Sequence, residues 1–157
     1  MFKSFLVLIL SVFLLFSCSK KNDEIATKPT EEEFVASLYA EAVEALKKGD
    51  AFRAGNKFKE AESLLPQSEW AAKASLMASY ADYSRNSYSD SIFGLERHIK
   101  NYPADKNIPY AHYLIAICYY EQILDEKKDL QPLEQAKKKF EFVLLNYPET
   151  DYAIDSR

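Results

Sequence analysis

Apolar residues recur every three or four positions along most of the chain, with polar residues between them, a pattern typical of the buried face of an amphipathic helix. The first run consists of Phe34, Leu38, Ala42, Ala45 and Leu46. Gly49 and Asp50 follow it and predict a helix end. The second run consists of Ala54, Phe58, Ala61, Leu64 and Leu65. Pro66 predicts its end, because proline cannot continue a helix.

The spacing inside the second predicted helix recurs twice further along the chain. A small residue, a large residue four positions later and a proline eight positions after that occur as Ala54-Phe58-Pro66, Ser91-Leu95-Pro103 and Ala136-Phe140-Pro148. This order, with a period of about 34 residues, is the signature of tetratricopeptide repeats, in which a small residue lets two helices approach closely. With only three glycines and no alternating strand pattern, the sequence predicts an all-α fold, a right-handed solenoid of antiparallel helix pairs.

This solenoid is predicted to occupy residues 31–157, with repeats at about 34–66, 70–103 and 109–148. The third repeat is longer because of a charged insertion, Asp125 to Pro132, between its helices. Such insertions change stability little, and we expect it to be a loop without a required function; the alternative is an interaction loop. Thr150 and Asp151 predict a further helix start, yet the chain stops at Arg157. Because a solenoid needs a cap over its last apolar face, we expect a longer protein whose carboxy-terminal repeats are absent here.

An apolar run precedes this domain, from Phe5 to Phe16, interrupted only by Ser11. It is shorter than the roughly 20 residues that span a bilayer but suits the core of an export signal. Leu15-Phe16-Ser17-Cys18 is similar to the bacterial lipobox, so residues 1–17 are predicted to be a lipoprotein signal peptide and Cys18 its lipidated first residue. The alternative is a plain secretory signal with an incidental cysteine. Residues 18–30 are almost entirely polar and predict a flexible tether.

Composition and charge narrow the function classes. With 20 Lys and Arg against 24 Asp and Glu, the chain has a net charge of −4 and no basic block, which argues against nucleic-acid binding. His98 and His112 lie on different repeats and fit packing positions, and Cys118 lies in an apolar run typical of a buried thiol. No metal-ligand spacing and no glycine-rich phosphate loop occurs. We therefore predict a non-enzyme without metal or other cofactor.

A solenoid of this kind usually binds a peptide along the face that its first helices form. Alignment of the repeats predicts nine groove positions, five of them tyrosines: Tyr39, Val43, Leu46, Leu76, Tyr80, Tyr83, Tyr113, Ile117 and Tyr120. Such a groove suits a peptide with aromatic side chains. The alternative is that these tyrosines pack between repeats. Lys73 and Arg85 flank the middle first helix and could pair with a peptide carboxylate, although single basic residues are usually only solvated.

The chain resembles the BamD family, also called ComL, of outer-membrane β-barrel assembly lipoproteins. The resemblance rests on the lipobox, the polar tether, the divergent repeats and two sequence segments. These segments are Tyr-Pro-Ala-Asp-Lys-Asn-Ile-Pro-Tyr-Ala at 102–111 and Asn-Tyr-Pro-Glu-Thr-Asp-Tyr-Ala at 146–153. Members of that family carry five repeats, and this chain has three. The resemblance implies an outer-membrane anchor facing the periplasm of a Gram-negative bacterium. It transfers no catalytic residue, and only Cys18 carries over by motif position.

The resemblance also implies partners: a BamA-type β-barrel insertase, other assembly lipoproteins, and the carboxy-terminal segments of unfolded outer-membrane proteins, which end in an aromatic residue. The family makes some of these contacts through its carboxy-terminal half, and the resemblance does not decide whether this chain makes them. The alternative function is a tetratricopeptide lipoprotein that serves as a scaffold for pilus assembly or envelope division.

Overall fold

The computed structural model describes residues 29–123 and 129–157, and within them the chain is helical, with no strand. The helices are α2 (Glu31–Lys47), α3 (Ala51–Leu64), α4 (Glu69–Ser84), α5 (Tyr88–Asn101), α6 (Ile108–Tyr120), α7 (Gln131–Asn146) and α8 (Asp151–Asp155). The predicted signal peptide, the lipidation site Cys18 and the tether up to residue 28 lie outside the described residues.

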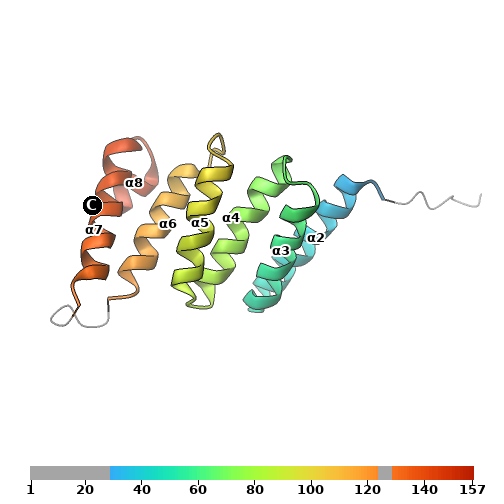
Figure 1. The fold of residues 1–157 in the computed structure, drawn as a ribbon, viewed down its shortest axis with the longest axis horizontal. Helices are drawn as coiled ribbons and strands as arrows, with labels where there is room; N and C mark the ends of the chain where they lie inside the picture. Colours follow the sequence, from blue (N-terminus) through green and yellow to red (C-terminus); the bar gives the residue numbers. More distant parts are fainter. Residues whose placement is uncertain (1–28, 124–128) are drawn as a thin grey trace, which may run out of the picture.

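Each helix packs against the next one in the sequence, and Figure 1 shows them side by side in one row from α2 to α8. Consecutive helices run antiparallel in Figure 1, and turns of a few residues join all of them except α6 and α7, which the predicted insertion separates. The chain therefore forms an open stack of helical hairpins, which confirms the predicted all-α helical-repeat fold. The first helices of the pairs are α2, α4, α6 and α8. Neighbouring first helices also contact each other: α2 contacts α4, and α6 contacts α8.

The small and large repeat positions lie in the core of this stack. Ala54 and Ser91 are fully buried and Ala136 is 1% exposed, so the helices approach closely at each of them. The Ser91 hydroxyl donates to the Ser79 carbonyl of the preceding helix at 2.9 Å, so this polar residue is satisfied inside the core. Phe58 and Leu95 are fully buried at the large position, whereas Phe140 is half-buried.

Helix ends follow local polar residues. Thr30 forms a capping box with Glu33, in which each side chain accepts from the other residue's backbone N–H. Gly49 ends α2 with a φ of 81°, a conformation that glycine adopts without strain. Thr150 accepts from the Ala153 N–H, so the predicted helix start at the carboxy-terminal end is confirmed.

Three details of the predicted pattern are wrong. Phe34 and Leu64 are each 44% exposed, whereas Val35 after Phe34 and Glu62, two residues before Leu64, are buried. The pattern missed Glu62 because its burial depends on an arginine from another repeat. Gln131 and the proline after it belong to the first turn of α7 rather than to a loop, because proline is tolerated there; residues 124–128 of the insertion lie outside the described part.

Candidate functional site

The first helices of the pairs border an open, shallow hollow of about 290 Å³. Its lining comes from α2, α4, α6 and α8 and from the residue before α6; the residues are Tyr39, Lys73, Leu76, Met77, Asn107, Tyr110 and Tyr152. We call it the tyrosine hollow. It draws on all four first helices, so the stacking of the hairpins brings together residues more than a hundred positions apart in the sequence.

Aromatic rings support each wall of the tyrosine hollow. On one side Tyr39 contacts the rings of Phe58 and Trp70, with centroids 5.1 and 5.4 Å apart. On the other side Tyr152 contacts Tyr110 at 5.4 Å and Tyr113 at 5.5 Å. Such contacts hold the rings in fixed positions, so the hollow presents preformed aromatic surface.

Burial raises the pKa of the Tyr39 and Tyr110 hydroxyls above their ordinary value. Both therefore remain neutral at physiological pH and can donate a hydrogen bond as well as accept one. A ligand that enters the tyrosine hollow meets apolar rings with polar tips and no tyrosinate charge.

Lys73 provides the charge of this site. Its ammonium lies 5.1 Å from the centre of the Trp70 ring, within the range of a cation–π contact. Its carboxylate partner among the described residues, Glu69, is 3.8 Å away and its side chain is 93% exposed, so solvent screens that ion pair strongly. The ammonium can therefore turn toward an incoming anion at small loss.

A second crevice of about 530 Å³ continues from the tyrosine hollow along the turns that precede α4 and α6. Lys73 and Asn107 line both spaces, so they mark the boundary between them. Pro103 and Ala104 on the far wall give the crevice an apolar side. A bound chain has room to pass from the aromatic rings over Lys73 to the edge of the stack.

The nine predicted groove residues fall into three groups. Tyr39 and Leu76 line the tyrosine hollow, although Leu76 is only 6% exposed and belongs mainly to the core. Six others are half-buried against the packed helices, namely Val43, Leu46, Tyr80, Tyr83, Tyr113 and Ile117. Tyr120 lies at the end of α6 and is 58% exposed. The structure thus brings together only part of the predicted set.

Four lining residues are not among the predicted groove positions, namely Met77, Asn107, Tyr110 and Tyr152. Tyr110 precedes the predicted Tyr113 by three residues on α6, and helical spacing could have identified it as a neighbour on the same face. Tyr152 gave no signal of this kind, because it reaches the hollow from α8 only when the hairpins stack.

The two basic residues that the sequence singled out have different surroundings. Arg85 donates two hydrogen bonds to Asp82 and pairs with Asp90 at 3.4 Å, so its charge is already balanced. The ion pair of Lys73 within the described residues is longer, 3.8 Å to Glu69, and its ammonium lies beside the Trp70 ring. The geometry therefore favours Lys73 as the residue that meets a carboxylate.

The buried thiol and histidines have packing roles. Cys118 is fully buried, as predicted, and burial raises the pKa of its thiol to about 11. His98 is fully buried beside Tyr102, and His112 contacts Phe142 and Tyr147. In residues 29–123 and 129–157, no three His, Cys, Asp or Glu side chains are grouped so that they could hold a metal ion. Within the same ranges no helix has the length and hydropathy to cross a membrane.

Comparison with known proteins relates the chain to one family. The sequence model of the YfiO family, described as "Outer membrane lipoprotein", matches residues 31–157. An outer membrane protein assembly factor BamD from Caulobacter vibrioides is 41% identical over 135 residues, which cover 84% of this chain and 44% of that protein. The protein of the same name from Rickettsia prowazekii is 33% identical over 138 residues, 88% of this chain and 53% of the relative. One from Xylella fastidiosa, strain Temecula1, is 28% identical over 161 residues, 96% of this chain and 54% of the relative. The chain thus spans about half the length of these curated relatives.

Proposed function

Because the chain belongs to the YfiO family of outer membrane lipoproteins, we propose that it is a non-catalytic, periplasm-facing component of the machinery that assembles outer-membrane β-barrel proteins. The name of its relatives, outer membrane protein assembly factor, supports this function over the alternative in pilus assembly or envelope division. A BamA-type insertase and other assembly lipoproteins are its proposed partners, and lipidated Cys18 is its proposed membrane anchor.

The tyrosine hollow is the proposed receiving site for unfolded clients, and its ligand is a carboxy-terminal segment that ends in an aromatic residue. An aromatic ring would lie among Tyr39, Tyr110 and Tyr152, where edge and tilted contacts between rings are already the rule. The preceding residues would run through the adjoining crevice toward the edge of the stack.

Lys73 is the observation that carries this proposal. A terminal carboxylate beside the last aromatic ring would meet the Lys73 ammonium, whose present partner Glu69 is distant and exposed. The neutral Tyr39 and Tyr110 hydroxyls would donate hydrogen bonds without repelling this anion. Ordering a disordered segment offsets part of this gain, so affinity should be modest, as a transient receptor requires.

The test is equilibrium binding of a labelled peptide that ends in Phe, compared as the free acid and as the carboxamide. Wild type should bind the free acid more tightly by about fivefold, the effect of roughly 1 kcal/mol for one partly exposed ion pair. Lys73→Gln should remove this preference and retain the carboxamide affinity. Lys100→Gln is the matched control, because Lys100 is an exposed lysine of α5 that lines neither space.

Equal binding of the two peptides to wild type, or an unchanged preference in Lys73→Gln, would reject Lys73 as the carboxylate partner. Absence of binding by either peptide would reject the hollow as the client site.

A further inference from the structure

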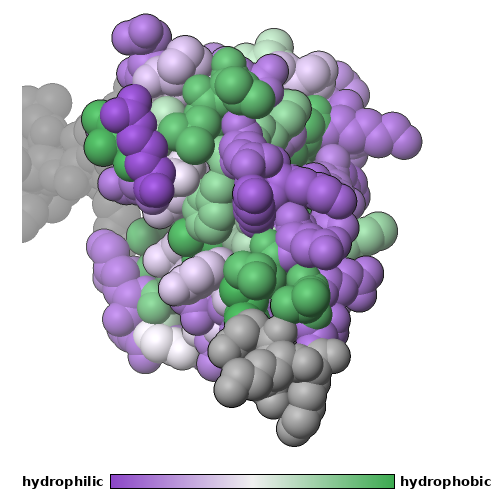
Figure 2. Space-filling view, turned by 90° about the vertical axis from the view of Figure 1, so that its left-hand side faces the viewer, coloured by the Kyte–Doolittle hydropathy of each residue, from purple (hydrophilic) through white to green (hydrophobic). Residues whose placement is uncertain are grey.

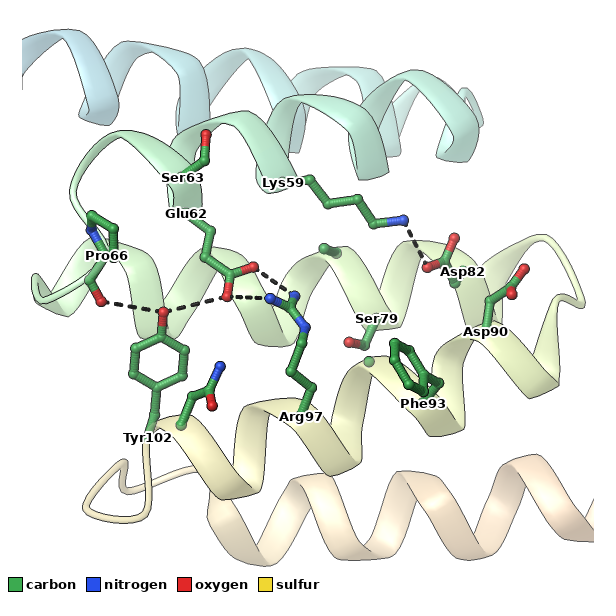
Figure 3. A pocket seen from close by; sticks show the side chains of 13 residues that line it. Lys59, Glu62, Ser63, Pro66, Ser79, Asp82, Asp90, Phe93, Arg97 and Tyr102 are labelled. Atoms are coloured by element: carbon green, nitrogen blue, oxygen red, sulfur yellow. Dashed lines mark hydrogen bonds and ion pairs between the residues drawn. The ribbon is translucent and has the colours of Figure 1, made fainter.

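A larger recess lies on the other side of the stack, between the second helices α3 and α5 and above α4 (Figure 3). Its volume is about 670 Å³, and we call it the α3–α5 groove. Asp82 of α4 lines this groove, and Lys73 of α4 lines the tyrosine hollow. These residues are nine positions apart, which is about two and a half helical turns. The groove and the hollow therefore lie on opposite sides of the same helix.

The α3–α5 groove is continuous with the proposed path of the client. Asn101 and Tyr102, at the end of α5, line both the groove and the adjoining crevice. In the same way, Lys73 and Asn107 line both the crevice and the tyrosine hollow. The three recesses thus follow one another around the edge of the stack. A chain bound in the hollow can continue along them to the other side.

The floor of the α3–α5 groove is made of small residues. Ala78 and Ser79 of α4 are buried, and Gly94 of α5 lies against them. The Ser79 hydroxyl already donates to the Ser75 carbonyl at 3.1 Å, so the floor offers mainly apolar surface. Phe93 is 72% exposed and borders this floor (Figure 3). Apolar side chains of modest size can therefore lie on the floor and contact the Phe93 ring.

The walls of the α3–α5 groove carry polar side chains of both charge signs. Arg97 donates to both oxygens of Glu62 at 2.9 and 2.7 Å, and Lys59 pairs with Asp82 at 3.2 Å. Asp90 pairs at 3.4 Å with the arginine that follows α4. Each of these carboxylates already has a basic partner, so the groove favours a ligand without a strong net charge. The same side chains retain hydrogen-bonding capacity toward a bound backbone.

We propose that the α3–α5 groove binds the residues upstream of the client's carboxy-terminal end, in an extended conformation. This inference rests on the proposed client site in the tyrosine hollow. In an extended chain, successive side chains point to opposite faces, and the backbone N–H and C=O groups point sideways. Every second side chain would then face the apolar floor, and the backbone groups would face the polar walls. Strands of outer-membrane β-barrels alternate apolar and polar residues, so a client strand has the pattern that this groove accepts.

The dimensions of the α3–α5 groove give the length of the bound segment. Its lining residues on α5 extend from Asp90 to Asn101, which is about 16 Å at about 1.5 Å per residue. An extended chain rises about 3.3 Å per residue, so about five client residues fill the groove. Phe93 lies about 12 Å from Asn101 along α5. An apolar client residue about four positions upstream of the one beside Asn101 would therefore contact Phe93.

The probes are three labelled peptides that end in Phe as the free acid. The short peptide has about six residues, and the long peptide adds about six upstream residues that alternate Thr and Val, enough to fill the groove. The polar control has Ser in place of each added Val. Fluorescence anisotropy with the full chain should show that the long peptide binds about five- to tenfold more tightly than the short one, because burial of the Val side chains exceeds the cost of ordering them. The polar control should lose most of this gain.

One variant and one control test the location. Phe93→Ala should weaken binding of the long peptide by about three- to fivefold and leave the short peptide unaffected. Leu145→Ala should change neither affinity, because Leu145 is an 80% exposed apolar residue of α7 that lines none of the three recesses. Both side chains are largely exposed, so circular dichroism should show an intact fold.

Equal affinity for the long and short peptides, with the free-acid preference that depends on Lys73 intact, would overturn this proposal and leave the client site standing. Unchanged binding of the long peptide by Phe93→Ala would also overturn it. Failure of all three peptides to bind would overturn both proposals. A chain that self-associates without peptide and loses this association in Phe93→Ala would assign the groove to a second copy instead.

Discussion

Replacing Phe58 by alanine tests whether the repeat positions carry the stability of the stack. The Phe58 side chain is fully buried and its ring contacts Tyr39 edge-on at 5.1 Å. A buried phenylalanine hides about 150–250 Å² of surface, worth about 4–6 kcal/mol at about 25 cal/mol per Å². Alanine keeps part of this contribution, so we expect the free energy of unfolding to fall by about 3–5 kcal/mol, the usual range for Phe→Ala in a core.

The matched control is Phe140, which occupies the same repeat position but is only half-buried. Phe140→Ala should lower the free energy of unfolding by about 1–2 kcal/mol, since less apolar surface is lost. Urea unfolding followed by far-UV circular dichroism measures both variants, provided that the dependence on urea stays constant. Equal losses in the two variants would refute the reasoning, because burial would then not decide the contribution of this position.

Three further predictions concern a glycine pair, a histidine and a thiol. Gly94→Ala should destabilise the chain by about 1–3 kcal/mol, because the added methyl group would clash with Ser79. Gly55→Ala should be neutral or stabilise the chain by up to about 1 kcal/mol, because the nearest contact of its added methyl group is at an ordinary 3.6 Å. Thermal unfolding measures both variants, and the reverse order of stability would contradict the close packing of α4 on α5. Burial lowers the pKa of His98, so the unfolded chain binds a proton at this residue more readily than the folded chain does. The free energy of unfolding should therefore fall as the pH drops below about 6.5. His98→Leu should reduce this pH dependence, and an unchanged pH dependence would exclude His98 as its source. Cys118, with its pKa raised to about 11, should resist alkylation at pH 8 until the chain unfolds, as peptide mapping by mass spectrometry can show; rapid labelling in the native state would contradict its burial.

The repeat pattern of the second helices was predictable because it is local. Ala54 and Ser91 must be small wherever two helices cross closely, and Phe58 four residues later points to the same side, so spacing alone identifies them. The prediction failed at Phe34 and Leu64, which are apolar but exposed. Both residues lie at the edge of the apolar face of their helix. There, the spacing of apolar residues cannot show which of two adjacent residues is buried, because that depends on the packing of other helices.

The sequence pattern could not predict the burial of Glu62 or the tyrosine hollow, because both depend on how the helical hairpins stack. Glu62 is buried since Arg97, 35 residues later, donates two hydrogen bonds to it across two repeats. Tyr152 reaches Tyr110 from α8 in the same way. The sequence did single out Lys73, yet its location between two hollows and beside the Trp70 ring required the three-dimensional arrangement.

The central claim is that clients bind the side of the stack that carries the tyrosine hollow, and ¹⁹F NMR of the chain labelled with 3-fluorotyrosine tests it most directly. On addition of a peptide that ends in Phe, the resonances of Tyr39, Tyr110 and Tyr152 should shift. The resonance of Tyr119 should stay in place, because Tyr119 lines neither the tyrosine hollow nor the adjoining crevice. Tyr102, whose hydroxyl lies near Glu62 and Pro66 (Figure 3), lines the crevice and is not suited as this control. Figure 2 shows apolar patches among polar side chains on the end of the stack where α7 and α8 lie. Leu145 on α7 and Ile154 on α8 are 80% and 62% exposed. Binding confined to these two residues would leave Tyr39 on α2 unshifted. A shift of Tyr119 with unchanged signals from Tyr39, Tyr110 and Tyr152 would contradict the claim.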